Sequence, residues 1–177
     1  MDLDASIKRF IGVDHGNWAR YAHPWTGLTR VITLPLFFVA WQSISWIGIW
    51  AAIPIATVFV WVVLHTRVFP PLKDYNNWVS RGLLGEQWYL ARKRGDIPFD
   101  LLRNLYVSLG VLMVSLVPLS FGLGELAPGW IALGTILIVA GQLMLLKCCD
   151  LIFQHMTGHI PGTPLTDPKL PPSGDKK

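Results

Sequence analysis

Side chains that could do chemistry gather in three polar segments of the chain. These are Asp14, His15, Asn17, Arg20, His23 and Arg30; then Asp74, Arg81 and Glu86; then Asp150, His155 and His159. Carboxylates and imidazoles are common general acids and bases in enzymes. Glu86, His15 and Asp150 are therefore the candidate catalytic residues.

Arginines in and near these segments suggest an anion site. A guanidinium holds a phosphate or carboxylate through two parallel hydrogen bonds. Four arginines could bind the headgroup of a small amphipathic molecule: Arg20, Arg30, Arg81 and Arg103. Trp18 and Trp78 lie near two of them in the sequence and are candidate contacts to the same molecule.

A metal site and a purely structural role are the alternatives for these clusters. His155 and His159 have i, i+4 spacing, so on a continuous helix they would face one side and could bind a metal with His15, His23, Asp150 or Glu86. Gly158 and Pro161 predict that the helix ends there, and no HExxH motif is present. The cofactor thus stays unknown. The carboxylates could instead form ion pairs that neutralise the end of a helix bundle.

Apolar helices must position all of these groups. Hydrophobic residues make up 52% of the chain and charged residues 15%, against about 25% charged in soluble domains. Four apolar stretches, at about 28–45, 46–65, 101–121 and 128–147, approach the roughly 20 residues of a membrane-spanning helix. We expect an all-α integral membrane protein with four transmembrane helices in two hairpins. Residues 1–160 would form one domain, and the proline-rich tail 161–177 would be disordered.

The charge distribution predicts an orientation. Every lysine and arginine precedes or begins the first span, lies between the second and third spans or begins the third, or ends or follows the fourth. The loops at the opposite ends of the spans carry a single charge, Glu125. Basic loops stay on the cytoplasmic side. We expect a multi-pass protein of the cell (inner) membrane with both termini, and all three polar segments, on the cytoplasmic face.

Helical surface segments are expected on that face, within residues 2–27 and 68–100. In the second, Asn76 or Asn77 can cap a helix, and Trp78, Leu84, Trp88 and Ala91 form a partial apolar stripe. Such a helix would lie in the interface against lipid headgroups.

Residues within the spans limit the possible functions. No Asp, Glu, Lys or Arg lies at mid-depth, which disfavours an ion-coupled transporter. Pro35, Pro54 and Pro118 predict kinks in three helices. Small residues that allow close helix packing are Gly110, Gly134 and Gly141.

The segments "WARYAHPWTGLTR", "FPPLKDYNNWVSRGLLGE" and "CDLIFQHM" resemble a family of small prokaryotic multi-helix membrane proteins catalogued only as a domain of unknown function. The resemblance extends to about residue 160. It covers Trp18, Arg20, Pro24, Thr29, Arg30, Asn77, Trp78, Arg81, Gly82, Gly85, Glu86 and Asp150. The chain departs from the family pattern at Tyr21 and His23, where the family has His and Asn. The resemblance implies the same topology but no activity.

Two interpretations of function remain open. In the first, the protein binds or modifies an amphipathic anionic or lipid-like molecule at the membrane. In the second, it is a non-catalytic accessory or assembly subunit that packs against a membrane-protein partner or a second copy. A small channel or transporter is a third, weaker alternative, and no nucleic-acid partner is expected, because the net charge of +4 is explained by orientation and lipid contact.

Overall fold

The computed structural model describes residues 21–70, 72–91 and 97–166, and this part of the chain is helical, with no strand. Its elements are α3 (Pro24–Gln42), α4 (Ile44–Ile47), the 3₁₀ helix η1 (Gly48–Ala51), α5 (Ala52–Val68), α6 (Trp78–Ala91), α7 (Phe99–Glu125) and α8 (Pro128–Thr157). The predicted surface helix before residue 21, with His15, Trp18 and Arg20, lies outside the described residues, as does the tail from residue 167.

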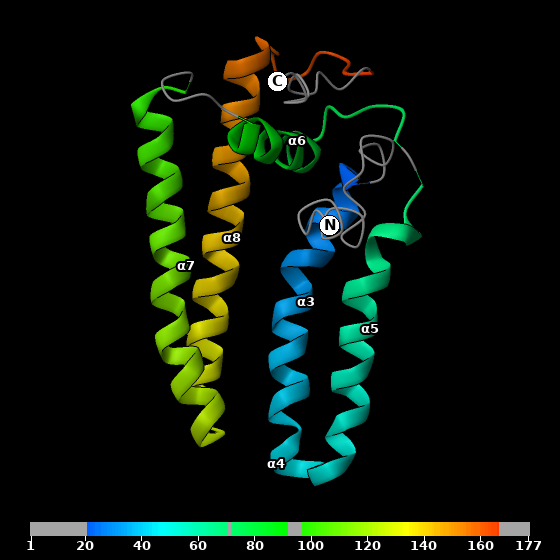
Figure 1. Ribbon diagram of the computed structural model, residues 1–177, viewed down its shortest axis with the longest axis vertical. Coiled ribbons are helices and arrows are strands. Elements are labelled where there is room, and N and C mark those ends of the chain that lie inside the picture. Colours follow the sequence, from blue (N-terminus) through cyan, green and yellow to red (C-terminus); the bar gives the residue numbers. More distant parts are fainter. Residues whose placement is uncertain (1–20, 71, 92–96, 167–177) are drawn as a thin grey trace, which may run out of the picture.

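The long helices form two antiparallel hairpins that stand side by side (Figure 1). Helices α3 and α5 are joined by α4 and η1, and α7 and α8 by a tight turn in which Leu126 has a left-handed backbone (φ 49°). Gly134 and Gly141 let α8 approach α7, because a Cβ at either would meet Leu119 or Leu112 within 3 Å. Their predicted packing role is confirmed. A Cβ added at Gly110 would meet nothing within 4 Å, so Gly110 takes no part in this close helix packing.

Three helical stretches are long and apolar enough to cross a membrane: Pro24–Leu64, Phe99–Glu125 and Pro128–Thr157. The first has 41 residues and comprises α3, the turn after it and α5 as far as Leu64. Large apolar side chains cover the outside of the bundle, among them Val39, Phe59, Val117 and Ile136, each more than half exposed. So many exposed large apolar side chains are typical of a membrane protein.

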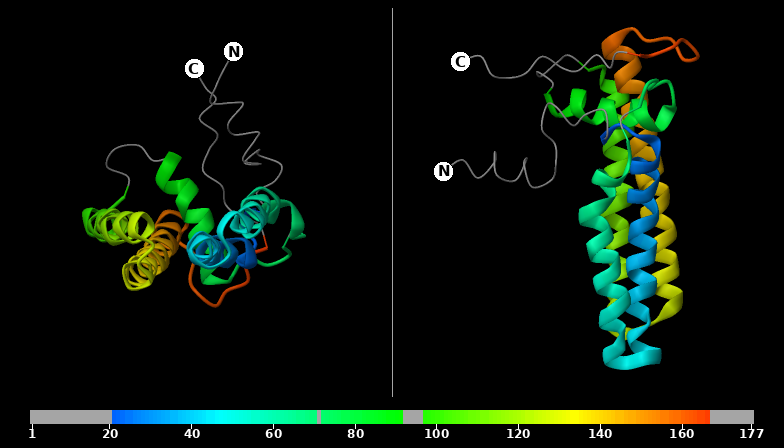
Figure 2. Two further views of the ribbon diagram at one scale, coloured as in Figure 1. Left: turned by 90° about the horizontal axis from the view of Figure 1, so that it is seen from below. Right: turned by 90° about the vertical axis from the view of Figure 1, so that its right-hand side faces the viewer.

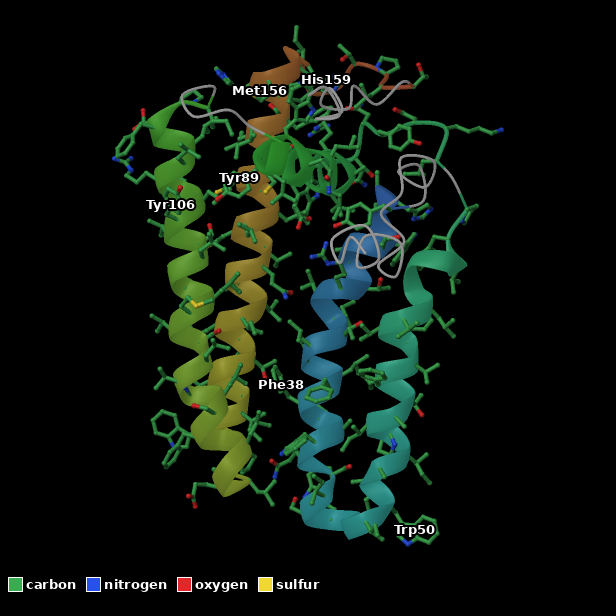
Figure 3. The ribbon with its side chains drawn as sticks, viewed as in Figure 1. Phe38, Trp50, Tyr89, Tyr106, Met156 and His159 are labelled. Atoms are coloured by element: carbon green, nitrogen blue, oxygen red, sulfur yellow. The ribbon has the colours of Figure 1, made fainter. Side chains whose placement is uncertain are left out.

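The two hairpins meet chiefly where α3 faces α8. Phe38 of α3, labelled in Figure 3, packs with Leu119, Ile131 and Ile138 of α7 and α8. Gln42 Nε2 also donates a hydrogen bond of 3.0 Å to the carbonyl oxygen of Leu126. The hairpins are therefore joined near the connecting turns.

At the other end, α6 lies across the bundle (Figure 2). Asn77 caps it as predicted, because its Oδ1 accepts a hydrogen bond from the Val79 backbone N–H at 2.9 Å. Gly82 and Gly85 allow α6 to touch α8, since added Cβ atoms would lie 2.6 Å from Leu146 O and 1.9 Å from Cys149 O. The predicted helix is thus present, but its middle is buried against α8 and its stripe residue Trp78 is 37% exposed.

The helices differ in extent from the expected spans, and one predicted kink is absent. Helix α3 begins at Pro24, whose fixed φ suits a first helical position. Because the turn extends to Ala51, α5 begins only at Ala52. Pro54 therefore lies in the first turn of α5, where proline does not kink a helix. Helix α8 continues ten residues beyond Lys147, where the expected span ends, and stops at Thr157 before Gly158, as Gly158 and Pro161 predicted. Helix α6 packs against its last turns, where Phe153 is buried.

Candidate functional site

Three polar side chains meet where α6 crosses α3. Arg30 Nη1 donates to Tyr21 Oη at 2.8 Å and to Glu86 Oε2 at 3.3 Å. The Tyr21 hydroxyl donates to the same Glu86 oxygen at 3.1 Å. We call Tyr21, Arg30 and Glu86 the polar triad. It brings together two of the predicted site residues and one, Tyr21, that the sequence analysis did not choose.

Each member of the triad has a definite source in the fold. Arg30 is on the second turn of α3, after the capped start at Pro24. Glu86 follows Gly85, so the close approach of α6 to α8 fixes its position. Tyr21 lies two residues before the His23 cap of α3, and its hydroxyl reaches Glu86 of α6.

The surroundings of Tyr21 disfavour its ionisation. Burial, and next the negative charge of Glu86, raise the pKa of Tyr21 to about 12, although Arg30 opposes the shift. A tyrosine with its ordinary pKa of about 10 is already neutral at neutral pH, and the Tyr21 hydroxyl donates its proton in the hydrogen bond to Glu86. The ion pair of Arg30 and Glu86 is partly open, with side chains 44% and 35% exposed.

A cavity of about 240 Å³ opens beside the triad. Four helices contribute to its lining, which comprises Gly27, Arg30 and Val31 of α3; Gly82, Leu83 and Glu86 of α6; Leu112 of α7; and Gln142, Leu145, Leu146 and Cys149 of α8. Arg30 and Glu86 give it a charged end, whereas most of the remaining wall is apolar. It lies between the two joined ends of the hairpins.

Several hydrogen-bonding groups in this cavity have no partner within the described part of the chain. Both hydrogen bonds of Arg30 use Nη1, which leaves Nε and Nη2 available. Glu86 accepts only through Oε2, which leaves Oε1 available. Gln142 Oε1 is buried and accepts no hydrogen bond. The cavity therefore offers donors and acceptors to a guest molecule.

Arg81 and Asp150 form a separate, buried cluster. Arg81 Nε donates to Asp150 Oδ1 at 2.7 Å, with side chains only 7% and 0% exposed. Lys147 Nζ donates to Asp150 Oδ2 at 2.7 Å, and Gln154 Nε2 to Oδ1 at 2.9 Å. Arg81 Nη1 also donates to the carbonyl and the side-chain oxygen of Asn76. This network ties α6 to α8 and corresponds to the structural interpretation of the polar clusters.

The structure does not bring the remaining predicted contacts to the cavity. Arg103 lies on α7 and is 62% exposed, 3.9 Å from the carboxylate of Asp100. Trp78 begins α6 and is absent from the cavity wall. His15, Trp18 and Arg20 lie outside the described residues.

His155 and His159 lie near the end of α8, where Figure 3 labels His159. The helix stops at Thr157 and Gly158 adopts a left-handed conformation (φ 65°), so the two histidines do not share a continuous helix. Within residues 21–70, 72–91 and 97–166, no three His, Cys, Asp or Glu side chains are grouped to hold a metal. The i, i+4 geometry considered for a metal site is thus not formed.

Two residues of the site escaped the sequence analysis. Tyr21 was visible only as a departure from the family pattern. Gln142 was visible as a large polar residue in an apolar span, which is a general indication of a buried contact or site. Neither feature reveals which other residues lie nearby.

Comparison with protein families matches residues 2–169 to the "Family of unknown function (DUF6653)". Comparison with curated proteins found no match, and comparison with solved structures found none. The match extends over both hairpins and α6, and so over the whole described site.

Proposed function

We propose that this chain, which belongs to the family of unknown function DUF6653, binds an amphipathic anionic or lipid-like small molecule at the cavity beside the polar triad. The single observation that carries the proposal is the composition of the cavity. It has Arg30 and Glu86 at one end and leucines and valine along its wall. A molecule with a charged head and an apolar tail matches both parts.

The free atoms of Arg30 support an anionic head. Nε and Nη2 are adjacent on one edge of the guanidinium, which is the geometry that receives two oxygens of a phosphate or carboxylate. Glu86 already contacts Nη1 at 3.3 Å, so it orients the guanidinium. Glu86 Oε1 can accept a proton from a bound molecule, so Glu86 could act as a general base if the protein also modifies its ligand.

The proposal includes a membrane topology. Helices α3, α5, α7 and α8 would each cross the bilayer, with α6 and the polar triad at the cytoplasmic face of the cell membrane. Lysine and arginine are concentrated in the segments of the sequence that lie at this end of the helices, which supports that orientation. The exposed apolar surface of the hairpins would contact lipid tails.

Native mass spectrometry of the protein purified from its own membranes in mild detergent tests the proposal. Wild type is compared with Arg30→Gln and with Arg103→Gln, which removes an exposed arginine away from the cavity. We expect a bound amphiphile on the wild type and on Arg103→Gln, and its loss from Arg30→Gln.

Equal occupancy of all three proteins, or no bound small molecule on any of them at equal folded yield, would overturn the proposal. A partner protein that co-purifies equally with all three would then favour the accessory-subunit alternative. Helix α5 is suited to such a role, because it packs mainly on α3 and its outer face, including Phe59 and Ile53, is exposed.

A further inference from the structure

Gln142 lies deeper in the cavity than the polar triad. From the geometry we infer that the ligand carries a second polar group, a hydroxyl or amide N–H in the linker between its anionic head and its apolar chain, which donates to Gln142 Oε1. This inference rests on the proposed function, since it concerns the same cavity. It narrows the ligand from any anionic amphiphile to one with a hydrogen-bond donor below its head.

The state of the Gln142 side chain is the first step. Its Oε1 is buried and has no hydrogen-bond partner, yet the residue lines the cavity. A buried acceptor without a partner is unfavourable and is rare in folded proteins. A ligand group that donates to Oε1 would remove this penalty when it binds, so Gln142 is suited to recognising the ligand.

The second step is the spacing along α8. Cys149 borders the cavity near the triad, because its carbonyl oxygen lies against Gly85, the neighbour of Glu86. Gln142 is seven residues earlier on the same helix, which corresponds to about 10 Å at 1.5 Å per residue. Leu145 and Leu146 lie between them. The head of the ligand would therefore lie beside the charged groups of the triad, the next part of its chain beside Leu145 and Leu146, and a more distant part beside the amide of Gln142.

The third step concerns the chemistry of that amide. A glutamine side chain has an acceptor oxygen and an NH₂ donor. A hydroxyl can satisfy both, because it donates one hydrogen bond and accepts others. A phosphate or carboxylate amphiphile whose linker bears a free hydroxyl fits this pair, whereas an unsubstituted alkyl chain leaves Gln142 Oε1 unpaired.

Binding of matched amphiphiles to the detergent-solubilised protein, measured by isothermal titration calorimetry, tests the inference. The phosphate pair is 8-hydroxyhexadecyl phosphate and hexadecyl phosphate. The carboxylate pair is 9-hydroxyhexadecanoate and hexadecanoate. In both hydroxylated members the hydroxyl lies about as far from the anionic group as Gln142 lies from Cys149 along α8. The two pairs distinguish the two sources of anionic charge. The proteins are wild type, Gln142→Met, which keeps the length of the side chain, Leu112→Met as a lining control, and Arg30→Gln.

For at least one pair, we expect wild type and Leu112→Met to bind the hydroxylated member about tenfold more tightly than its partner, which is the effect of one good hydrogen bond. Gln142→Met should abolish this preference by weakening only the hydroxylated member. Arg30→Gln should weaken both members.

Two results would overturn the inference, and they differ in what they leave standing. Equal affinities within both pairs for wild type, together with no effect of Gln142→Met, would refute the role of Gln142 while loss of binding in Arg30→Gln preserves the proposed function. No binding of any of the four probes to wild type would remove the proposed function and the inference together.

Discussion

Asp150 is the most completely buried charge among the described residues, with a side chain 0% exposed between Arg81 and Lys147. Asp150→Asn would keep the shape of this side chain but leave Arg81, 7% exposed, with an uncompensated charge. Breaking a buried ion pair from one side typically costs about 3–5 kcal/mol. We expect a loss of this size in the free energy of unfolding, measured by circular dichroism during denaturation in detergent.

Asp100→Asn is the matched control, because it removes the carboxylate of an exposed ion pair. Asp100 and Arg103 are 82% and 62% exposed at 3.9 Å, and such surface pairs contribute less than about 1 kcal/mol. Similar destabilisation by the two substitutions would contradict the distinction between the buried network and the surface pair.

At the residue scale, the sequence predicted types of side chain better than their grouping. Arg30, Glu86, Arg81 and Asp150 were all candidates, but they divide into an open site and a buried network. The division depends on which face of α6 meets α8. Since Arg81 and Glu86 are five residues apart on one helix, they point in different directions, and the sequence alone does not say which direction is buried.

Among the elements, α6 depends on two glycines. A Cβ at Gly85 would lie 1.9 Å from the carbonyl oxygen of Cys149, a backbone atom that cannot move aside easily. Gly85→Ala should therefore push α6 away from α8. Overpacking usually costs about 1–3 kcal/mol and sometimes more. We expect a lower melting temperature in detergent and a loss of ligand at the cavity, because Glu86 is the next residue.

Gly110→Ala provides the comparison for that substitution. Gly110 lies inside α7 with nothing within 4 Å of an added Cβ, and alanine favours a helix over glycine by about 1 kcal/mol. This variant should be as stable as wild type or more so. If Gly85→Ala were equally well tolerated, the close crossing of α6 and α8 would be wrong.

The start of α3 should be sensitive to acid. His23 Nδ1 accepts a hydrogen bond of 3.3 Å from the Trp25 backbone N–H, and burial lowers the pKa of His23 below its ordinary 6.5. A lowered pKa means that the neutral form is favoured by folding. The stability from this cap is therefore present above pH 6.5 and is lost as the pH falls through the folded-state pKa.

His23→Asn tests this cap, because asparagine caps helices well and does not titrate. Relative to wild type, the melting temperature of His23→Asn should rise when the pH is lowered from 7.5 to 5.0. A difference between the two proteins that stays constant with pH would show that His23 is not the titrating cap. His23→Ala, which lacks a cap at every pH, controls for the loss of the ring and of its stacking on Phe69.

The elements themselves were largely predictable, because long apolar runs and an asparagine cap are local features. Their ends were predictable only in part. Gly158 and Pro161 indicated the end of α8 at Thr157. The contact with α6 that buries residues such as Phe153 was not indicated, because it joins distant segments; Arg81 and Asp150, for example, are 69 residues apart. Pro54 was predicted to kink a helix that was expected to begin near Trp46. The turn before α5 is longer than expected, so α5 begins only at Ala52 and Pro54 lies in its first turn.

On the scale of the whole molecule, the two hairpins are joined at both ends and leave the cavity between them. Phe38 and Gln42 join one end, and α6 spans the other. Figure 3 shows that Trp50 and His159 mark these opposite ends. The proposed orientation places the end with His159 and the polar triad at the cytoplasm and the end with Trp50 outside.

Cysteine labelling tests this arrangement. In a background with Cys148 and Cys149 replaced by alanine, single cysteines are placed at Glu125, the last residue of α7, and at Lys73, between α5 and α6; both positions are exposed. A membrane-impermeant maleimide should label Glu125→Cys in intact cells and Lys73→Cys only after permeabilisation. Ser45→Cys, in the turn after α3, should behave like Glu125→Cys, because two hairpins of spanning helices place both turns on one side. Opposite labelling of Ser45→Cys and Glu125→Cys would require an odd number of crossings between them, which four spanning helices in two hairpins do not allow.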